Sequence, residues 1–144
     1  MKRKQDVMLK YGKTAQTAIS AISVLAESYD GGDTKHSSLD IAQKRDLPRP
    51  LVAKLLVTLS GADLVKGSRG PGGGYWLARE PSTICLREIV DLFEHDHDRI
   101  LCPFGVNFCP NDNPCPLHDQ LWEMSRKFGQ FLDDTNLSVF QPGK

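Results

Sequence analysis

The 144-residue sequence contains no apolar run near the roughly 18–20 residues that a membrane helix requires. It also lacks the signal-peptide pattern of a basic start, an apolar stretch and a small-residue cleavage site. No internal repeat and no long low-complexity tract is present. The hydrophobic fraction of 40% and the charged fraction of 25% argue against disorder and against a fibrous protein. We therefore expect a soluble, cytoplasmic chain of one domain, or one domain plus an appendage.

Enzyme signatures are absent as well. The sequence shows no catalytic-base constellation, no substrate motif and no ferredoxin-like run of four cysteines. These absences disfavour a metalloenzyme and an electron carrier, and they predict a protein that is not an enzyme and has no small-molecule substrate.

The formal net charge is zero, but the two halves of the chain carry opposite net charges. Residues 1–80 carry 13 Lys and Arg against 8 Asp and Glu, whereas residues 81–144 carry 5 against 10. A basic first half indicates a surface that faces a polyanion.

The first part of the chain has the residue spacing of three helices. Apolar residues at helical spacing predict a helix over residues 13–28, ended by the Asp-Gly-Gly-Asp run at 30–33. Ser37 and Asp40 have the spacing of a capping box, which predicts a second, short helix through Lys44. After a turn over residues 46–50, an apolar stripe predicts a third helix that stops at Gly61. The stripe consists of Leu51, Leu55, Leu56 and Leu59.

Two short β-prone runs follow, at residues 64–68 and 74–77, around a Gly- and Pro-rich turn, and they predict a hairpin. Helix, tight turn, helix and hairpin is the order of a winged helix-turn-helix, whose second helix enters the major groove of DNA. The first turns of this helix and the hairpin tip supply the expected DNA contacts. These residues are Arg49, Pro50, Ala53 and Lys54 in the helix, and Arg69, Gly70 and Gly72 in the hairpin.

The second half of the chain predicts a helix over residues 86–94, a polar linker and a proline-rich segment at 102–116 that cannot be helical. A helix then resumes with apolar residues spaced 4, 3, 4, 3, which is a seam of the coiled-coil type and predicts a homodimer. We expect three parts, at 8–80 for DNA binding, at 81–116 for a connecting helix and metal loop, and at 117–140 for dimerisation. The seam consists of Leu117, Leu121, Met124, Phe128 and Phe131.

Three of the four cysteines lie in one stretch with the spacing Cys102-x6-Cys109-x5-Cys115-x2-His118. Three thiols and an imidazole make a four-ligand metal site, and cysteines of an intracellular chain bind metal more often than they form disulfides. From this chemistry alone both zinc and an iron–sulfur cluster fit, with zinc favoured. The fourth cysteine, Cys85, sits in an apolar stretch and is expected to be a buried, inert thiol.

The run Leu64-Val-Lys-Gly-Ser-Arg-Gly-Pro-Gly-Gly-Gly-Tyr-Trp-Leu-Ala78 closely resembles the wing of the IscR/NsrR family of bacterial winged-helix transcription regulators. Three further segments resemble that family: Tyr11-Gly-Lys-Thr-Ala15, Leu39-Asp-Ile-Ala42 and the cysteine region. The resemblance extends from about residue 8 to 140. It implies a mostly α-helical fold with a small β-hairpin wing and a long C-terminal dimerisation helix, bound to a roughly palindromic double-stranded DNA operator.

The same resemblance implies an iron–sulfur cluster rather than zinc. IscR-like members hold a 2Fe–2S cluster through three cysteines and a histidine, which here are Cys102, Cys109, Cys115 and His118. NsrR-like members complete a 4Fe–4S site with an acidic residue of the partner subunit, and Lys13 stands at that position here. This favours 2Fe–2S over 4Fe–4S, although the first cysteine gap is six residues where the family pattern has five.

The resemblance therefore implies that DNA affinity responds to redox state, cluster supply or nitric oxide. The alternatives are a nitric-oxide-sensing repressor with a 4Fe–4S cluster and a zinc-stapled DNA-binding protein without a redox role.

Overall fold

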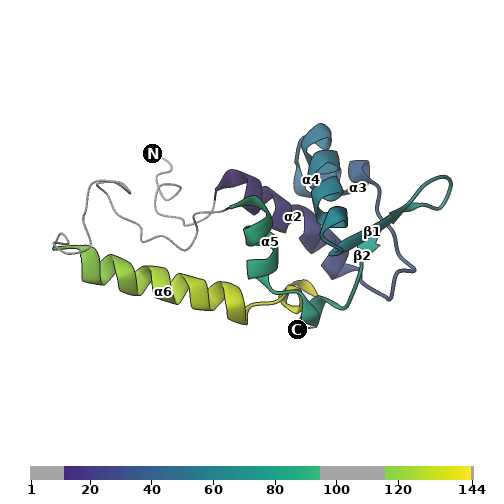
Figure 1. Ribbon diagram of the computed structural model, residues 1–144. Helices are drawn as coiled ribbons and strands as arrows, with labels where there is room; N and C mark the ends of the chain where they lie inside the picture. The colour runs from purple at the N-terminus through teal and green to yellow at the C-terminus, as the bar shows by residue number, and fades with distance from the viewer. Residues whose placement is uncertain (1–11, 95–115, 144) are drawn as a thin grey trace.

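A computed structural model describes residues 12–94 and 116–143, and Figure 1 shows their arrangement. Four helices and a two-stranded hairpin form a body, and one long helix extends away from it. Two short 3-10 helices complete the elements. Their order is α2 (Lys13–Glu27), α3 (Ser38–Arg45), α4 (Arg49–Gly61), β1 (Val65–Ser68), β2 (Gly74–Leu77), η1 (Pro81–Thr83), α5 (Leu86–Phe93), α6 (His118–Asp134) and η2 (Leu137–Phe140).

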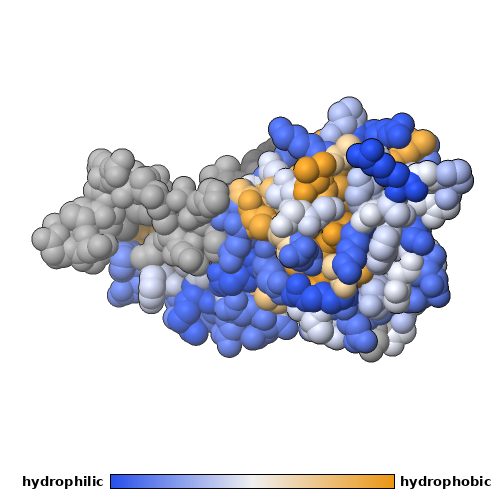
Figure 2. Space-filling model, turned by 45° about the vertical axis from the view of Figure 1, so that its right-hand side comes forward, coloured by the Kyte–Doolittle hydropathy of each residue, from blue (hydrophilic) through white to orange (hydrophobic). Residues whose placement is uncertain are grey.

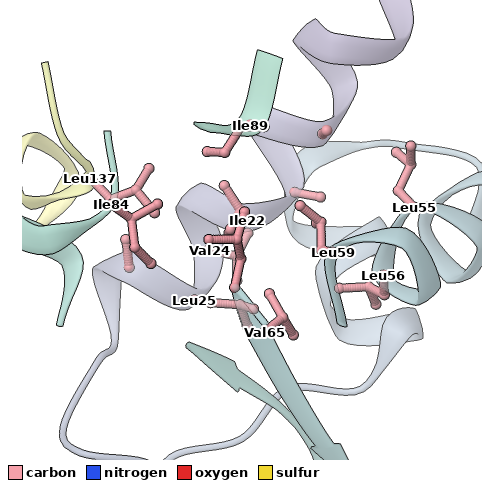
Figure 3. Packing of buried hydrophobic residues seen from close by; sticks show 14 of the residues in the cluster. Ile22, Val24, Leu25, Leu55, Leu56, Leu59, Val65, Ile84, Ile89 and Leu137 are labelled. Atoms are coloured by element: carbon pink, nitrogen blue, oxygen red, sulfur yellow. The ribbon is translucent and has the colours of Figure 1, made fainter. Parts of the chain in front are cut away.

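Helix α2 is the centre of the body. It contacts α3, α4, α5, β2 and η2, and its small residues Ala15, Ala18 and Ala21 are fully buried, which lets neighbouring elements approach closely. Figure 3 shows its larger side chains, Ile22 and Leu25 among them, between the leucines of α4 and the pair Ile84 and Leu137. The hydrophobic core is therefore built around one helix rather than between two layers.

The expected turn chemistry is confirmed at α3. Ser37 Oγ accepts a hydrogen bond from the Asp40 amide at 3.0 Å, and the Asp40 carboxylate accepts one from the Ser37 amide at 3.0 Å. Helix α3 ends at Arg45 and is capped by Asp46, which adopts the left-handed conformation with φ of 55°. Pro48 and Pro50 then start α4, where an absent amide hydrogen is tolerated.

The expected hairpin is confirmed as an antiparallel pair, with Val65 opposite Leu77 and Ser68 opposite Gly74. Val65 and Leu77 are buried, so the base of the hairpin is anchored in the core while its outer part projects from the body.

Helix α6 runs along the lower edge of Figure 1, with its C-terminal end at the body and its N-terminal end far from it. The chain after α6 returns to the body through two backbone hydrogen bonds. The Leu86 amide donates to the Thr135 carbonyl at 2.9 Å, and the Leu137 amide donates to the Ile84 carbonyl at 3.0 Å. These bonds fix the C-terminal end of α6 beside the start of α5.

The expected stripe of α4 is confirmed, since Leu55, Leu56 and Leu59 are buried and Leu51 packs half-buried against the core. Val52 is also fully buried and belongs to the same side of the helix. One detail of the sequence-based expectation is wrong. Cys85 is half-buried rather than buried, since it precedes α5 as its capping residue and not as a core residue. Within residues 12–94 and 116–143, none of the helices combines the length and the hydrophobicity that a membrane span requires.

Candidate nucleic-acid interface

Helix α4 has one apolar and one solvent-facing side. Its buried side chains are Val52, Leu55, Leu56 and Leu59, which pack into the core seen in Figure 3. The four residues expected to contact DNA lie away from these. Arg49, Pro50 and Lys54 are exposed and Ala53 is half-buried. The helix itself contains two cations and no acidic residue, so its outer side favours an anionic partner.

The tip of the wing is shaped by glycine. Gly70 and Gly72 have φ of 85° and 77°, a region that other residues rarely adopt. A turn closes where the Gly73 amide donates to the Gly70 carbonyl at 2.9 Å. A Cβ at Gly73 would lie 2.5 Å from the Ser68 carbonyl oxygen, so no larger residue fits there. The resulting narrow tip exposes Arg69, whose cation suits the negative potential of a DNA groove.

The loop before α3 supports the base of the wing, which sequence reasoning missed. His36 and Tyr75 exchange backbone hydrogen bonds of 3.0 and 2.7 Å, so His36 extends the hairpin by one residue on its outer edge. Lys35 Nζ lies 5.1 Å from the centre of the Trp76 ring, within the range of a cation–π interaction. A single bridging residue leaves no periodic pattern, so no sequence signal pointed to His36.

Arg45 fastens α3 to α2. Its guanidinium donates to Ser23 Oγ at 2.9 and 3.1 Å and pairs with the carboxylate of Glu27. This ties the first helix of the helix-turn-helix to the central helix. At the start of α3, the Ser37 amide and hydroxyl lower the pKa of the Asp40 carboxyl below its usual value of 3.8. Both contacts keep α3, and the turn that leads into α4, in one orientation.

Helix α6 exposes an apolar stripe. Among the expected seam residues, Leu117, Met124 and Phe131 are 43%, 48% and 47% exposed, while Leu121 and Phe128 are half-buried. The Phe128 and Phe131 rings lie with their centres 5.9 Å apart. Sequence reasoning did not single out Trp122, which is 51% exposed on α6 outside the expected seam.

Sequence reasoning also missed the contact that holds α6 to α5. Arg87 of α5 pairs with Asp133, and its Nη2 donates to the Gly129 carbonyl at 3.0 Å. Leu132, the neighbouring residue, is buried in the core. One end of α6 is therefore attached to the body.

Of the four candidate metal ligands, only His118 lies within the described residues. Cys102, Cys109 and Cys115 lie outside the described residues. So do Asp6, His95 and His97, whose carboxylate and imidazole groups compete with His118 as candidates for the fourth ligand. His118 is described as half-buried and is the first residue of α6. Within residues 12–94 and 116–143, no three His, Cys, Asp or Glu side chains gather closely enough to hold a metal ion.

A hydrogen bond also joins the end of α5 to the start of α2. Glu94, which follows α5, accepts a hydrogen bond from the Gly12 amide at 2.9 Å. Gly12 caps α2, and a Cβ at this position would lie 2.6 Å from Glu94 Oε2. The end of α5 is thereby linked to the start of the central helix.

A family model described as "Rrf2: Iron-dependent Transcriptional regulator" matches residues 11–141. The chain belongs to the Rrf2 family. A relative named HTH-type transcriptional regulator IscR, from Cereibacter sphaeroides, is 30% identical over 132 residues, which is 90% of this chain and 85% of the relative. The expected resemblance to IscR-type regulators is thereby confirmed.

Solved structures agree on the fold of this Rrf2 protein. The structure of CymR, the global cysteine regulator of B. subtilis, has a TM-score of 0.74 and 25% identity, over 92% of this chain and 97% of that chain. T. potens IscR has a TM-score of 0.66 and 28% identity, over 90% and 84%. The expected winged helix with a C-terminal helix is therefore confirmed, and the protein is a DNA-binding transcriptional regulator.

Proposed function

We propose that this Rrf2 regulator is a cytoplasmic homodimer that binds a roughly palindromic operator in double-stranded DNA. The observation that carries the proposal is the outer side of α4, where Arg49 and Lys54 are exposed on a helix without acidic residues. The opposite side is packed into the core, so the helix can present these cations rigidly. Arg69 on the wing tip adds a second cationic element.

The homodimer is supported by the stripe on α6. Leu117, Met124 and Phe131 would each leave nearly half of an apolar side chain in water, and a second copy of α6 would remove this exposure. A two-fold axis between the copies would set two α4 helices against two half-sites, which is the reason to expect a palindrome.

The second part of the proposal concerns control of DNA affinity by an iron–sulfur cluster held by Cys102, Cys109, Cys115 and His118, with 2Fe–2S favoured over 4Fe–4S. The donor set suits the group, because thiolates are the preferred ligands of iron–sulfur iron and histidine replaces cysteine in some 2Fe–2S sites. When bound, the cluster would supply a one-electron redox centre at the start of α6. The family description as iron-dependent agrees with this choice over zinc.

The chain's own residues offer a route from this site to the DNA-binding side. His118 starts α6, and Arg87 fixes the far end of the same helix to α5. Helix α5 packs on α2 and α4. A displacement of His118 would therefore act on a helix that is already joined to the body, and in a dimer it would change the distance between the two α4 helices.

The decisive experiment is anaerobic purification followed by an absorption spectrum and by counting iron, sulfide and zinc per chain. Brown protein with two irons and two sulfides supports the proposal, and four of each supports the nitric-oxide-sensing alternative. Colourless protein that contains zinc would overturn the proposal of an iron–sulfur cluster and would support the zinc-stapled alternative. Mutation of each of the three ligand cysteines to serine should abolish the cluster, whereas Cys85→Ser is the matched control that should retain it, since a serine preserves the cap of α5.

His118 is tested separately. Histidine ligation raises the reduction potential relative to an all-cysteine site, so His118→Cys should keep the cluster and lower its potential. His118→Ala should make the cluster more labile. If His118→Ala left the spectrum and the potential unchanged while Asp6→Ala or His97→Ala lost the cluster, the ligand assignment would be wrong although the cluster survived.

The DNA part is tested by Arg49→Ala and Arg69→Ala. If Arg49 reads a base, its loss should cost about 1–3 kcal/mol of binding free energy and relax base preference at one position. Loss of Arg69 should weaken all sequences more evenly and reduce the salt dependence of binding. Operator affinity unchanged in both variants would contradict the placement of α4 and the wing on DNA.

A further inference from the structure

The outer side of α4 carries an apolar side chain that neither the core nor the cationic contacts explain. Val57 is 68% exposed, the largest exposed fraction among the exposed large hydrophobic residues of the described chain. It stands in the interior of the helix, between the buried residues Leu56 and Leu59 but turned away from them.

Helical geometry places Val57 in line with the expected DNA contacts. It follows Pro50 by seven residues, which is about two turns, and Ala53 by four residues, which is about one. These three residues form an apolar strip, which we define as Pro50, Ala53 and Val57, on the side opposite the buried leucines. Lys54 is exposed beside the strip, one turn before Val57.

The charge around this strip indicates the chemistry of its partner. With Arg49 and Lys54 and no acidic residue on α4, the surface is suited to a polyanion and poorly suited to an apolar protein face. Among polyanions, duplex DNA combines phosphates with an apolar group in the major groove, the C5-methyl of thymine. The mixed character of the body surface, with hydrophobic patches among hydrophilic ones, is visible in Figure 2.

We propose that Val57 is a specificity-determining residue that contacts the C5-methyl group of a thymine in each half-site. This rests on the proposed function, because it requires α4 to lie in the major groove. The inference goes beyond the proposed function because it assigns base discrimination to an apolar side chain. Val57 favours a T·A pair over a C·G pair at one position.

The test begins with selection of a duplex from a random library by the purified wild-type protein. Each thymine of the selected half-site is then replaced by uracil, which removes the methyl group and keeps base pairing. At one position we expect uracil to weaken wild-type binding about three- to fivefold, as for one buried methyl group. Replacement of the C·G pair's cytosine by 5-methylcytosine at that position should restore part of the affinity lost on changing T·A to C·G.

The same scan is repeated with Val57→Ala. Alanine has a higher helix propensity than valine, so this variant keeps α4 intact and removes only the methyl groups. It should bind the thymine duplex about as weakly as the wild type binds the uracil duplex, and it should show no further uracil effect. Val139→Ala is the matched control, because Val139 is 56% exposed on η2, away from α4, and it should retain the full uracil effect.

Two results would overturn the inference. An equal uracil effect in wild type and Val57→Ala would show that another residue reads the methyl group. Sedimentation of Val57→Ala as a smaller species than the wild type would show that a second copy of the chain covers this side chain. Failure of the wild type to enrich any duplex is distinguishable from both, since it would overturn the proposed function itself and the inference with it.

Discussion

The central helix α2 and the terminal helix α6 have similar lengths but opposite surroundings. Helix α2 has 15 residues, nine of them buried, whereas α6 has 17 residues of which Ser125 and Leu132 are buried. Both helices carry apolar residues at helical spacing. In α2 these meet α3, α4, α5 and β2, while in α6 much of the apolar surface has no neighbour in the described chain.

Among the described residues, the body therefore buries its apolar side chains within the chain, whereas α6 leaves much of its apolar side exposed. The body buries its core around α2 and holds α3 with Arg45. Helix α6 is attached at one end by Arg87 and Leu132, and its other end starts at His118. Mutations in the two regions should accordingly have different effects, and five predictions test this.

The largest effect is expected from breaking the proposed pairing of α6. Leu121→Glu with Met124→Glu places two charges in the apolar stripe and should give monomers in sedimentation. A monomer loses the second half-site, so operator affinity should fall by a factor of about 10²–10⁴. The control is Gln130→Glu, which adds a charge at an exposed position of α6 that neighbours no stripe residue at helical spacing. An intact dimer in the double variant would exclude this helix as the interface.

The second prediction concerns the core of the body. Leu56 is fully buried, so Leu56→Ala should reduce the free energy of unfolding by about 2–5 kcal/mol in chemical denaturation. Val139→Ala, at a position 56% exposed, should change it by less than about 0.5 kcal/mol. Similar losses in the two variants would mean that the body core is packed differently from this description.

The third prediction concerns the attachment between the regions. Arg87→Ala removes the partner of Asp133 and of the Gly129 carbonyl, and it should cost about 1–2 kcal/mol of stability in thermal unfolding. Arg126 provides the control, because its pair with Glu123 lies within α6 on the surface. Although this pair lowers the pKa of Glu123 and raises that of Arg126, solvent screens it, and Arg126→Ala should leave the melting temperature nearly unchanged. A larger decrease in melting temperature for Arg126→Ala than for Arg87→Ala would contradict this prediction.

The smallest effect is expected at the cap of α3. Ser37→Ala should reduce stability by about 0.5–1 kcal/mol, because the Asp40 amide loses its acceptor. Ser37→Thr should retain most of the cap.

The same cap gives a pH dependence. The pKa of the Asp40 carboxyl is lowered in the folded protein, chiefly by the Ser37 amide. Folding therefore favours the carboxylate, and its contribution is present above the unfolded pKa of about 4 and is lost as the pH falls through the lowered folded value. Asp40→Asn should be less stable than the wild type at pH 7, and the difference should shrink in acid. A constant difference at all pH values would contradict this assignment.

Much of this protein could be predicted from local sequence patterns. The capping box of Ser37 and Asp40, the proline start of α4 and the glycine-rich wing each depend on residues close in the chain, and each is confirmed. The exposed positions of Arg49 and Lys54 follow from the same helical periodicity. The spacing of the α4 leucines also predicts that Val57 faces outward. Its apolar neighbours in the sequence, however, give no indication that it contacts DNA.

Other features depend on residues far apart in the chain. The bonds of Arg87 to α6, of Glu94 to Gly12 and of His36 to Tyr75 have no periodic or adjacent signal, and sequence reasoning did not find them. Cys85 was misjudged because its apolar neighbours predict burial, whereas its position before α5 is that of a cap.

Local sequence patterns were enough to predict the order of the elements, the turns between them and the family, while the ligand set of three cysteines and a histidine stays a prediction. These depend on residue type and short spacing, which act through local backbone preferences and ligand chemistry. Which apolar stripe is buried and which is left exposed follows from the packing of the elements in three dimensions. Helices α2 and α6 show similar periodicity, and burial depends on whether another element comes within contact distance, which is a property of the whole fold.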